Sequence, residues 1–260
     1  MSTPSATPRA FFWYELMSPD RAAAVAFYTK LLGWQASDFG GSGVPYTVLS
    51  VGRCGIGGVM DLTPEMRAAG VPPCWMGYVD SDDVDATTAR ILAAGGKVHR
   101  GPADIPGVGR FAVVADPYGA AFMLLKASSP EGMPPLAPGT PGSVGWRELY
   151  VGDGARAFAF YSSIFGWTKG DAVDMGPMGV YQLFAAGAEP IGGMMTKPPQ
   201  VPAPAWLYYF NVESIDAAPA AATAGGARVL HGPSEVPGPM WVVQCLDPQG
   251  AMFALVASKR

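Results

Sequence analysis

The feature of this sequence that most limits its fold is an internal duplication. Residues 13–34 align without gaps with residues 146–167, and 11 of these 22 positions carry the same amino acid. Average residue usage would give about one or two identities over this length. The similarity continues with small gaps through Gly57-Gly58 and Gly192-Gly193, Trp75 and Trp206, Gly95-Gly96 and Gly225-Gly226, and DPYG at 116–119 and DPQG at 247–250. The chain therefore contains two copies of one structural unit.

A segment rich in proline and glycine separates the two copies. Residues 127–143 contain five prolines and three glycines, a composition that continues neither a helix nor a central strand. A chain of 260 residues is also long enough for two ordinary cores. We therefore expect a first domain at 11–126, a linker at 127–143 and a second domain at 144–258.

Within each copy, the order strand, helix, short strands occurs twice. Residues 20–33 have helical apolar spacing, with Asp20 suited to the N-cap and Gly33 to a left-handed C-terminal position. A second helix is expected over about 84–94, before Gly95-Gly96. The two Asp-Pro tetrapeptides suit type I turns that join apolar strands as hairpins.

Together, the helix signature from Asp20 to Gly33, the double glycine after the second helix and the DPxG hairpin resemble the vicinal oxygen chelate superfamily of glyoxalases, bleomycin-resistance proteins and extradiol dioxygenases. The resemblance covers about 12–126 and 144–257. It implies an α+β fold of two tandem glyoxalase-like domains. In each domain, two βαβββ units would form an open eight-stranded cup, and the concave face of this cup would hold the ligand.

The resemblance also implies where a metal would bind, and this sequence departs from the pattern there. The ligand positions on the first, fifth and last strands correspond to non-ligand residues in both copies. They are Trp13 and Trp146, about Met76 and Leu207, and Met123 and Ala254. A divalent metal needs three or four converging His, Cys or carboxylate donors. We therefore predict no cofactor, and a divalent metal held by atypical ligands remains the alternative.

A glutamate recurs on the first strand of both copies. Since side chains alternate along a strand, Glu15 shares a face with Trp13, and Glu148 shares one with Trp146. By the family pattern that face is concave. A carboxylate there can pair with a cationic ligand group or act as a general base. The alternative is a glutamate at a wet rim, or one paired with an arginine such as Arg147.

Further residues are expected to line the cup and bind the ligand. They are Trp13, Tyr46, Tyr78 and Asp80 in the first copy, and Trp146, Tyr181, Tyr209 and Asn211 in the second. Tyrosines suit a small-molecule pocket, but they suit a half-buried strand equally well. Because Asp80 corresponds to Asn211, the copies are not chemically equivalent, and one of them can be a scaffold for the other.

The remaining reactive residue types give weaker signals. His99 and His231 fall out of register between the copies, so surface or structural roles are favoured over catalysis. Cys54, Cys74 and Cys245 fit neither a disulfide framework nor a structural zinc site, which favours reduced thiols. The loops at 104–110 and 235–240 either cover the mouth of the cup or are ordinary connections.

Composition limits the partners. The net charge of −4 comes from scattered residues, so nothing indicates nucleic-acid or membrane-surface binding. No stretch reads as a signal or membrane span, which favours a cytoplasmic protein whose partner is a small organic molecule. The oligomeric state is left open between a monomer with two paired domains and a homodimer.

The function expected from these observations is that of a glyoxalase/bleomycin-resistance-like protein that binds a small organic molecule in a cup-shaped pocket without the family's usual metal. The alternative is a glyoxalase-like lyase or related detoxifying enzyme that uses atypical metal ligands or acid/base catalysis by Glu15 or Glu148. Whether the protein is an enzyme stays open at this point, as does a dioxygenase-like activity.

Overall fold

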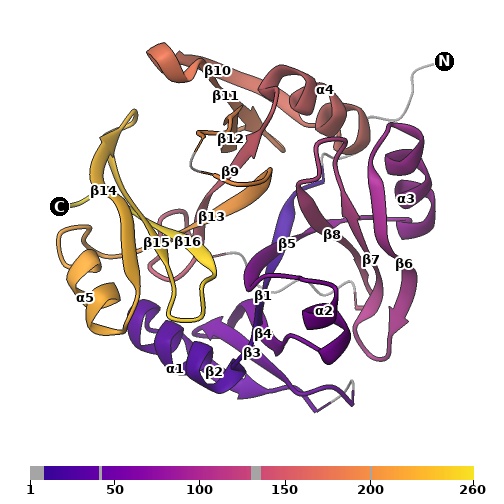
Figure 1. The fold of residues 1–260 in the computed structure, drawn as a ribbon, viewed down its shortest axis with the longest axis horizontal. Coiled ribbons are helices and arrows are strands. Elements are labelled where there is room, and N and C mark those ends of the chain that lie inside the picture. The colour runs from indigo at the N-terminus through magenta and orange to yellow at the C-terminus, as the bar shows by residue number, and fades with distance from the viewer. Residues whose placement is uncertain (1–8, 41–42, 130–135, 200) are drawn as a thin grey trace. The chain divides into compact units, whose positions relative to one another are not determined.

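The computed structural model describes residues 9–40, 43–129, 136–199 and 201–260, and it contains two eight-stranded mixed sheets (Figure 1). The first copy comprises β1 (Phe11–Ser18), α1 (Arg21–Leu32), β2 (Gln35–Asp38), β3 (Tyr46–Val51), β4 (Cys54–Asp61), α2 (Pro64–Ala68), β5 (Cys74–Asp80), α3 (Val84–Ala93), β6 (Lys97–Ile105), β7 (Gly109–Ala115) and β8 (Ala121–Ala127). The second comprises β9 (Val144–Val151), α4 (Gly154–Phe165), β10 (Thr168–Asp174), a 3-10 turn (Gly176–Met178), β11 (Val180–Ala185), β12 (Pro190–Thr196), β13 (Ala205–Asn211), α5 (Ala218–Ala224), β14 (Arg228–Val236), β15 (Met240–Leu246) and β16 (Met252–Ala257).

The two sheets have the same topology. Their strand orders are β2-β3-β4-β1-β5-β8-β7-β6 and β10-β11-β12-β9-β13-β16-β15-β14. Each copy thus contains two βαβββ units, which confirms the predicted α+β fold of two tandem glyoxalase-like domains. The short helix α2 was not expected from the sequence.

The predicted helix boundaries are also confirmed. The carboxylate of Asp20 caps α1 by accepting a hydrogen bond from the backbone N–H of Ala23 at 2.9 Å. Gly33 ends the helix in the left-handed region with φ of 68°. In the second copy, Asp153 and Gly166 take the same roles at the two ends of α4.

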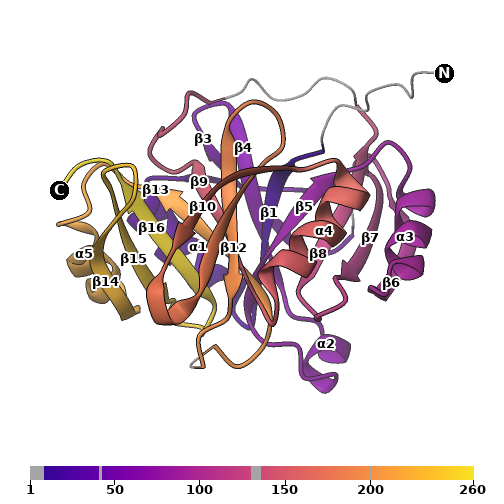
Figure 2. The same cartoon turned by 90° about the horizontal axis from the view of Figure 1, so that it is seen from above.

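Residues of the two copies are mixed in each compact unit of the structure. Of the described residues, one unit contains 9–12, 77–129, 147–199 and 201–206, and the other contains 13–40, 43–76, 136–146 and 207–260. In the second unit, α1 contacts α5 (Figure 1), and in the first, α3 contacts α4 (Figure 2). The compact units therefore do not coincide with the sequence repeats.

A fully buried tyrosine in each unit bonds the two copies to each other. The Tyr28 hydroxyl of α1 donates to the carboxylate of Asp247 at 3.0 Å and accepts from the Trp75 indole N–H at 2.9 Å. The carboxylate of Asp247 also accepts the backbone N–H groups of Gln249 and Ala251, which shapes the DPQG turn. One carboxylate therefore holds both its own hairpin and the helix of the other copy.

The other unit repeats this arrangement. The Tyr161 hydroxyl donates to Asp116 at 3.1 Å and accepts from the Trp206 indole N–H at 3.1 Å. Asp116 and Asp247 are 0% and 4% exposed, and burial raises the pKa of both carboxyl groups. The helix signature and the DPxG motif thus bond to each other across the copies.

Replacing Tyr28 by Phe should lower the free energy of unfolding by about 1–3 kcal/mol, because the Trp75 N–H and an Asp247 oxygen would lose a buried partner. Tyr161→Phe should have a similar effect. Denaturant unfolding followed by circular dichroism measures both. Tyr118→Phe, which alters a half-exposed tyrosine, is the control, and an equal loss in this variant would contradict the assignment.

Candidate functional site

Glu15, the glutamate of the first copy, lies on the face of its sheet opposite α1. Thr47 on β3 contacts Arg21 at the start of α1, so its neighbour Tyr46 lies on the other face of the strand. Glu15 on β1 is in register with Gly58 on β4. A side chain at Gly58 would meet the Tyr46 ring, which places Glu15, Gly58 and Tyr46 on one face.

Two consecutive glycines of β4, Gly57 and Gly58, allow close packing of a neighbouring strand and of an aromatic ring. A Cβ at Gly57 would collide with the backbone carbonyl of Tyr14 on β1. A Cβ at Gly58 would lie 2.3 to 2.4 Å from three atoms at the hydroxyl end of the Tyr46 side chain. Gly58 therefore lets the Tyr46 ring lie directly on the strand that pairs with Glu15.

The Tyr46 hydroxyl joins two of the predicted site residues. It accepts a hydrogen bond from the Trp13 indole N–H at 2.9 Å and is also hydrogen-bonded to Glu15. Burial raises the pKa of Tyr46 well above its usual value, and the negative charge of Glu15 raises it further. Tyr46 therefore stays a protonated phenol that donates to the Glu15 carboxylate, which is itself 6% exposed.

Cys74, at the start of β5, also lies close to this carboxylate. Burial raises the pKa of its thiol to about 12, and the charge of Glu15 contributes in the same direction. The thiol is therefore protonated at neutral pH and is no nucleophile there. Nothing in the sequence placed Cys74 beside Glu15, so this residue was not among the predicted site residues.

The second copy contains an equivalent pair. Glu148 on β9 is in register with Gly193 on β12, and a Cβ at Gly193 would lie 2.1 to 2.5 Å from the Tyr181 side chain. Glu148 is 6% exposed, the same value as Glu15. Trp146 is half-buried near the start of β9. In both copies, a buried glutamate is therefore in register with a glycine of the neighbouring strand, and a tyrosine ring packs against that glycine.

The other predicted ligand-binding residues have local partners. Asp80 accepts a hydrogen bond from Arg9 at 2.8 Å within an ion pair, and Asn211 donates to the Ser143 hydroxyl at 2.9 Å. Tyr78 and Tyr209 are 5% and 4% exposed. Asp80 and Asn211 thus hold neighbouring segments at the ends of β5 and β13. The ligand-binding role of these two residues and of the two tyrosines stays a prediction.

The residues at the family's metal-ligand positions do not fit a divalent ion. Trp13 uses its only polar atom to donate to Tyr46, and Met123 and Ala254 carry no suitable donor. Among the described residues, no group of three His, Cys, Asp or Glu side chains is arranged to hold a metal. His99 and His231 are exposed on β6 and β14.

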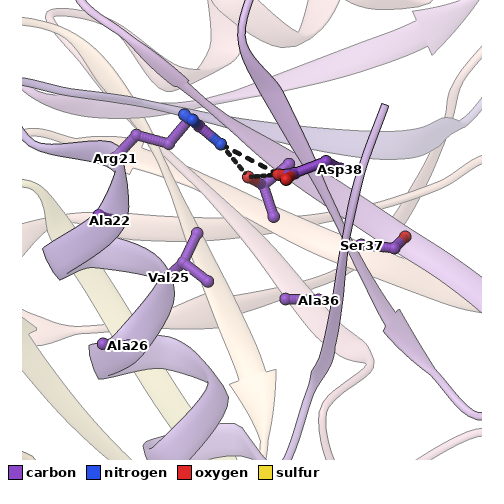
Figure 3. A pocket seen from close by; sticks show the side chains of 8 residues that line it. Arg21, Ala22, Val25, Ala26, Ala36, Ser37 and Asp38 are labelled. Carbon is purple, nitrogen blue, oxygen red and sulfur yellow. Dashed lines mark hydrogen bonds and ion pairs between the residues drawn. The ribbon is translucent and has the colours of Figure 1, made fainter. Parts of the chain in front are cut away.

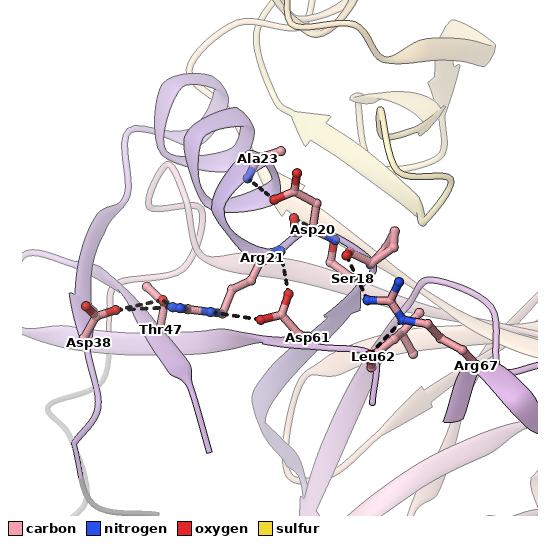
Figure 4. Close-up of polar contacts among 10 residues, drawn as sticks. Ser18, Asp20, Arg21, Ala23, Asp38, Thr47, Asp61, Leu62 and Arg67 are labelled. Carbon is pink, nitrogen blue, oxygen red and sulfur yellow. Dashed lines mark hydrogen bonds and ion pairs between the residues drawn. The ribbon is translucent and has the colours of Figure 1, made fainter. Parts of the chain in front are cut away.

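A cavity of about 390 Å³ lies on the helix side of the first sheet, lined by α1, β2 and β3 (Figure 3). Its polar end is Arg21, which is 3.3 Å from Asp38 and 3.5 Å from Asp61 (Figure 4). Asp61 also accepts the backbone N–H of Arg21 at 3.0 Å. Because two carboxylates and Thr47 engage Arg21, this network ties α1 to three strands, and it lies away from Glu15.

Comparisons with known proteins agree with this architecture. The family model of the "Glyoxalase/Bleomycin resistance protein/Dioxygenase superfamily" matches residues 10–124 and 143–255. The chain belongs to this superfamily. This confirms the resemblance inferred from the sequence motifs.

Curated relatives span nearly the whole chain. The "Putative glyoxylase CFP32" of Mycobacterium bovis is 33% identical over 94% of this chain and 93% of its own length. The "Anthracycline biosynthesis protein DnrV" of Streptomyces peucetius is 37% identical over 96% and 93%. The crystal structure of a Mn(II)-bound glyoxalase from Novosphingobium aromaticivorans has a TM-score of 0.65 at 16% identity, covering 98% of this chain and 83% of its own. This last likeness is one of fold.

Replacing Gly58 by Ala should force the Tyr46 ring away from β4 and lower the free energy of unfolding by about 1–3 kcal/mol through overpacking. The raised pKa of Tyr46 should fall in the same variant, since its contact with Glu15 is disturbed. Ultraviolet titration against a Tyr46→Phe reference measures this pKa. Gly101→Ala is the matched control, because a Cβ there meets nothing within 4 Å. An unchanged Tyr46 pKa in Gly58→Ala would show that the ring does not depend on this glycine.

Replacing Glu15 by Gln should lower the pKa of Cys74, because it removes the negative charge that disfavours the thiolate. Burial remains, so the pKa should stay above its usual value. At pH 8 a disulfide reagent should therefore label Cys74 faster in Glu15→Gln than in the unchanged protein. The Cys74→Ala variant identifies the signal, and equal labelling rates would contradict the proximity of the two groups.

Proposed function

We propose that this protein binds a small organic molecule on the sheet face that carries Glu15, Tyr46 and Trp13. The observation that carries the proposal is the recurrence of one arrangement in both copies. A buried glutamate is in register with a glycine against which a tyrosine ring packs, at Gly58 and again at Gly193. A carboxylate has several acceptor sites, so Glu15 can accept a hydrogen bond from a ligand as well as from Tyr46.

The chemistry of this face suits an aromatic ligand with hydrogen-bond donors. Trp13 and Tyr46 offer flat apolar surface, and Glu15 offers acceptor oxygens. The name of one relative supports the same class, since it is called an anthracycline biosynthesis protein. Anthracyclines are planar aromatic compounds with hydroxyl and carbonyl groups. Hydroxylated polycyclic aromatics are therefore the first ligands to test.

In this proposal, binding does not use the divalent metal of related enzymes. The support is the poor fit of Trp13, Met123 and Ala254 to metal coordination. Elemental analysis of dialysed protein tests this part directly. Zinc, nickel, manganese or iron at one atom per copy would contradict it.

The second candidate function is acid/base catalysis by a glyoxalase-like lyase or related detoxifying enzyme. The hydrogen bond of Tyr46 to Glu15 favours it, because a carboxylate and a protonated phenol can accept and donate a proton at neighbouring atoms. Glu148 and Tyr181 would form the corresponding pair in the second copy. Turnover of glutathione hemithioacetals, lost in Glu15→Gln or Glu148→Gln, would favour this function over simple binding.

Thermal unfolding in the presence of hydroxyanthraquinones, bleomycin and glutathione adducts tests the binding function. A ligand at 100 times its dissociation constant should stabilise the protein by about 2.7 kcal/mol. Glu15→Gln should reduce the shift in melting temperature, and Glu148→Gln reports separately on the second copy. His99→Gln, at an exposed strand residue, is the control. A ligand-induced shift that both glutamate variants retain would remove both residues from the site.

No helix in the described parts of the chain is long and apolar enough to cross a membrane. A cytoplasmic location, a small organic molecule as the partner and the lack of nucleic-acid or membrane partners remain part of the proposal. The choice between a monomer with paired domains and a homodimer does as well.

A further inference from the structure

Three side chains of the second copy form a row across neighbouring strands. Tyr209 on β13 is in register with Ala254 on β16, and Ala254 is in register with Gln244 on β15. Phe253, the neighbour of Ala254, packs against Phe27 of α1 with ring centroids 5.8 Å apart. The row therefore lies on the face of these strands opposite that helix.

This row is polar at both ends. The side-chain amide of Gln244 donates to the Tyr209 hydroxyl at 2.8 Å. Ala254 stands between them, is 0% exposed and is small enough for the Gln244–Tyr209 bond to pass over it. An amide beside a phenol offers both donors and acceptors.

The corresponding row of the first copy is apolar beyond its tyrosine. Tyr78 on β5 is in register with Met123 on β8, and Met123 is in register with Val113 on β7. Phe122 packs against Tyr161 of α4, so Met123 and its row lie on the face away from that helix. The copies thus share the tyrosine but differ at both other positions.

We propose that Gln244 and Tyr209 form a ligand-discriminating subsite of the second copy, which takes a carbonyl or hydroxyl group on a neutral aromatic ligand. This inference rests on the proposed binding function. Packing alone is satisfied by methionine and valine, as the first copy shows, whereas the half-buried amide of Gln244 loses part of its solvation. A site built to hydrogen-bond a polar group rejects an analogue that lacks this group, because its own polar atoms then lose a partner. The first copy offers only the hydroxyl of Tyr78 at this position.

Two compounds of nearly equal shape test the subsite. 2-Acetylnaphthalene carries a carbonyl oxygen that 2-ethylnaphthalene lacks, and equilibrium dialysis measures the affinity of each. The intact chain should bind the ketone about five- to tenfold more tightly, the effect of one net hydrogen bond. Gln244→Met, which keeps the length of the side chain, should remove this preference, and Tyr209→Phe should reduce it. Tyr118→Phe, which alters a half-exposed tyrosine of the DPYG turn outside the proposed site, is the control and should retain it.

Circular dichroism establishes that each variant is folded, and Tyr209→Phe carries the test if Gln244→Met is not. Equal affinities of the intact chain for the two compounds would overturn the subsite, as would a preference that survives in Gln244→Met or is lost in Tyr118→Phe. These outcomes leave the proposed binding function standing. If the intact chain binds neither naphthalene and no hydroxyanthraquinone, both the subsite and the proposed binding function are overturned.

Discussion

The structure depends on a buried hydrogen bond from a helix tyrosine of one copy to a turn aspartate of the other. Tyr28 and Asp247 form it in one unit, and Tyr161 and Asp116 form it in the other. Each aspartate also accepts two backbone N–H groups of its own turn, so a single carboxylate holds both hairpin and helix. Because each tyrosine also accepts an indole N–H, its hydroxyl has two buried partners. Neither copy therefore completes its helix-side core alone.

Because the helix-side cores contain these tyrosines, the sheet face away from the helices is available for ligand chemistry. Tyr28 and the aromatic rings around it occupy the helix side, while Glu15 and Tyr46 lie on the other face. Two consecutive glycines on β4 allow both the close strand pairing and the placement of the aromatic ring. Gly57 allows close pairing with β1, and Gly58 accommodates the Tyr46 ring. The same two constraints explain why Gly192 and Gly193 recur in the second copy.

Much of the fold could be predicted from the sequence, because repeated motifs fix it locally. Asp20, Gly33 and the Asp-Pro turns each impose a backbone conformation on their neighbours, and the structure confirms them. Alternation along a strand also placed Glu15 on the same face as Trp13. The bond from Tyr28 to Asp247 could not be predicted, since residues 219 positions apart meet only through packing of the two copies.

The repeat also selected the residues of the candidate site, whose ligand-binding role stays a prediction. The recurrence of Glu15 and Tyr46 in the second copy identified both residues, but their hydrogen bond depends on strand register. Cys74 and Gln244 have no matching residue in the other copy, so the repeat gave no signal for either. Asp80 and Asn211 stood out by their position, and only the structure shows that Arg9 and Ser143 engage them.

In the proposed function, the ligand binds beside the Glu15–Tyr46 pair. Nuclear magnetic resonance of protein with ¹³C-labelled tyrosine tests it most directly, because the chain contains only 10 tyrosines and a Tyr46→Phe variant assigns the decisive signal. On addition of a stabilising hydroxyanthraquinone, the Tyr46 resonance should move, while that of Tyr28 on the helix side stays in place. A Tyr46 resonance that does not move at saturating ligand would contradict binding beside this pair.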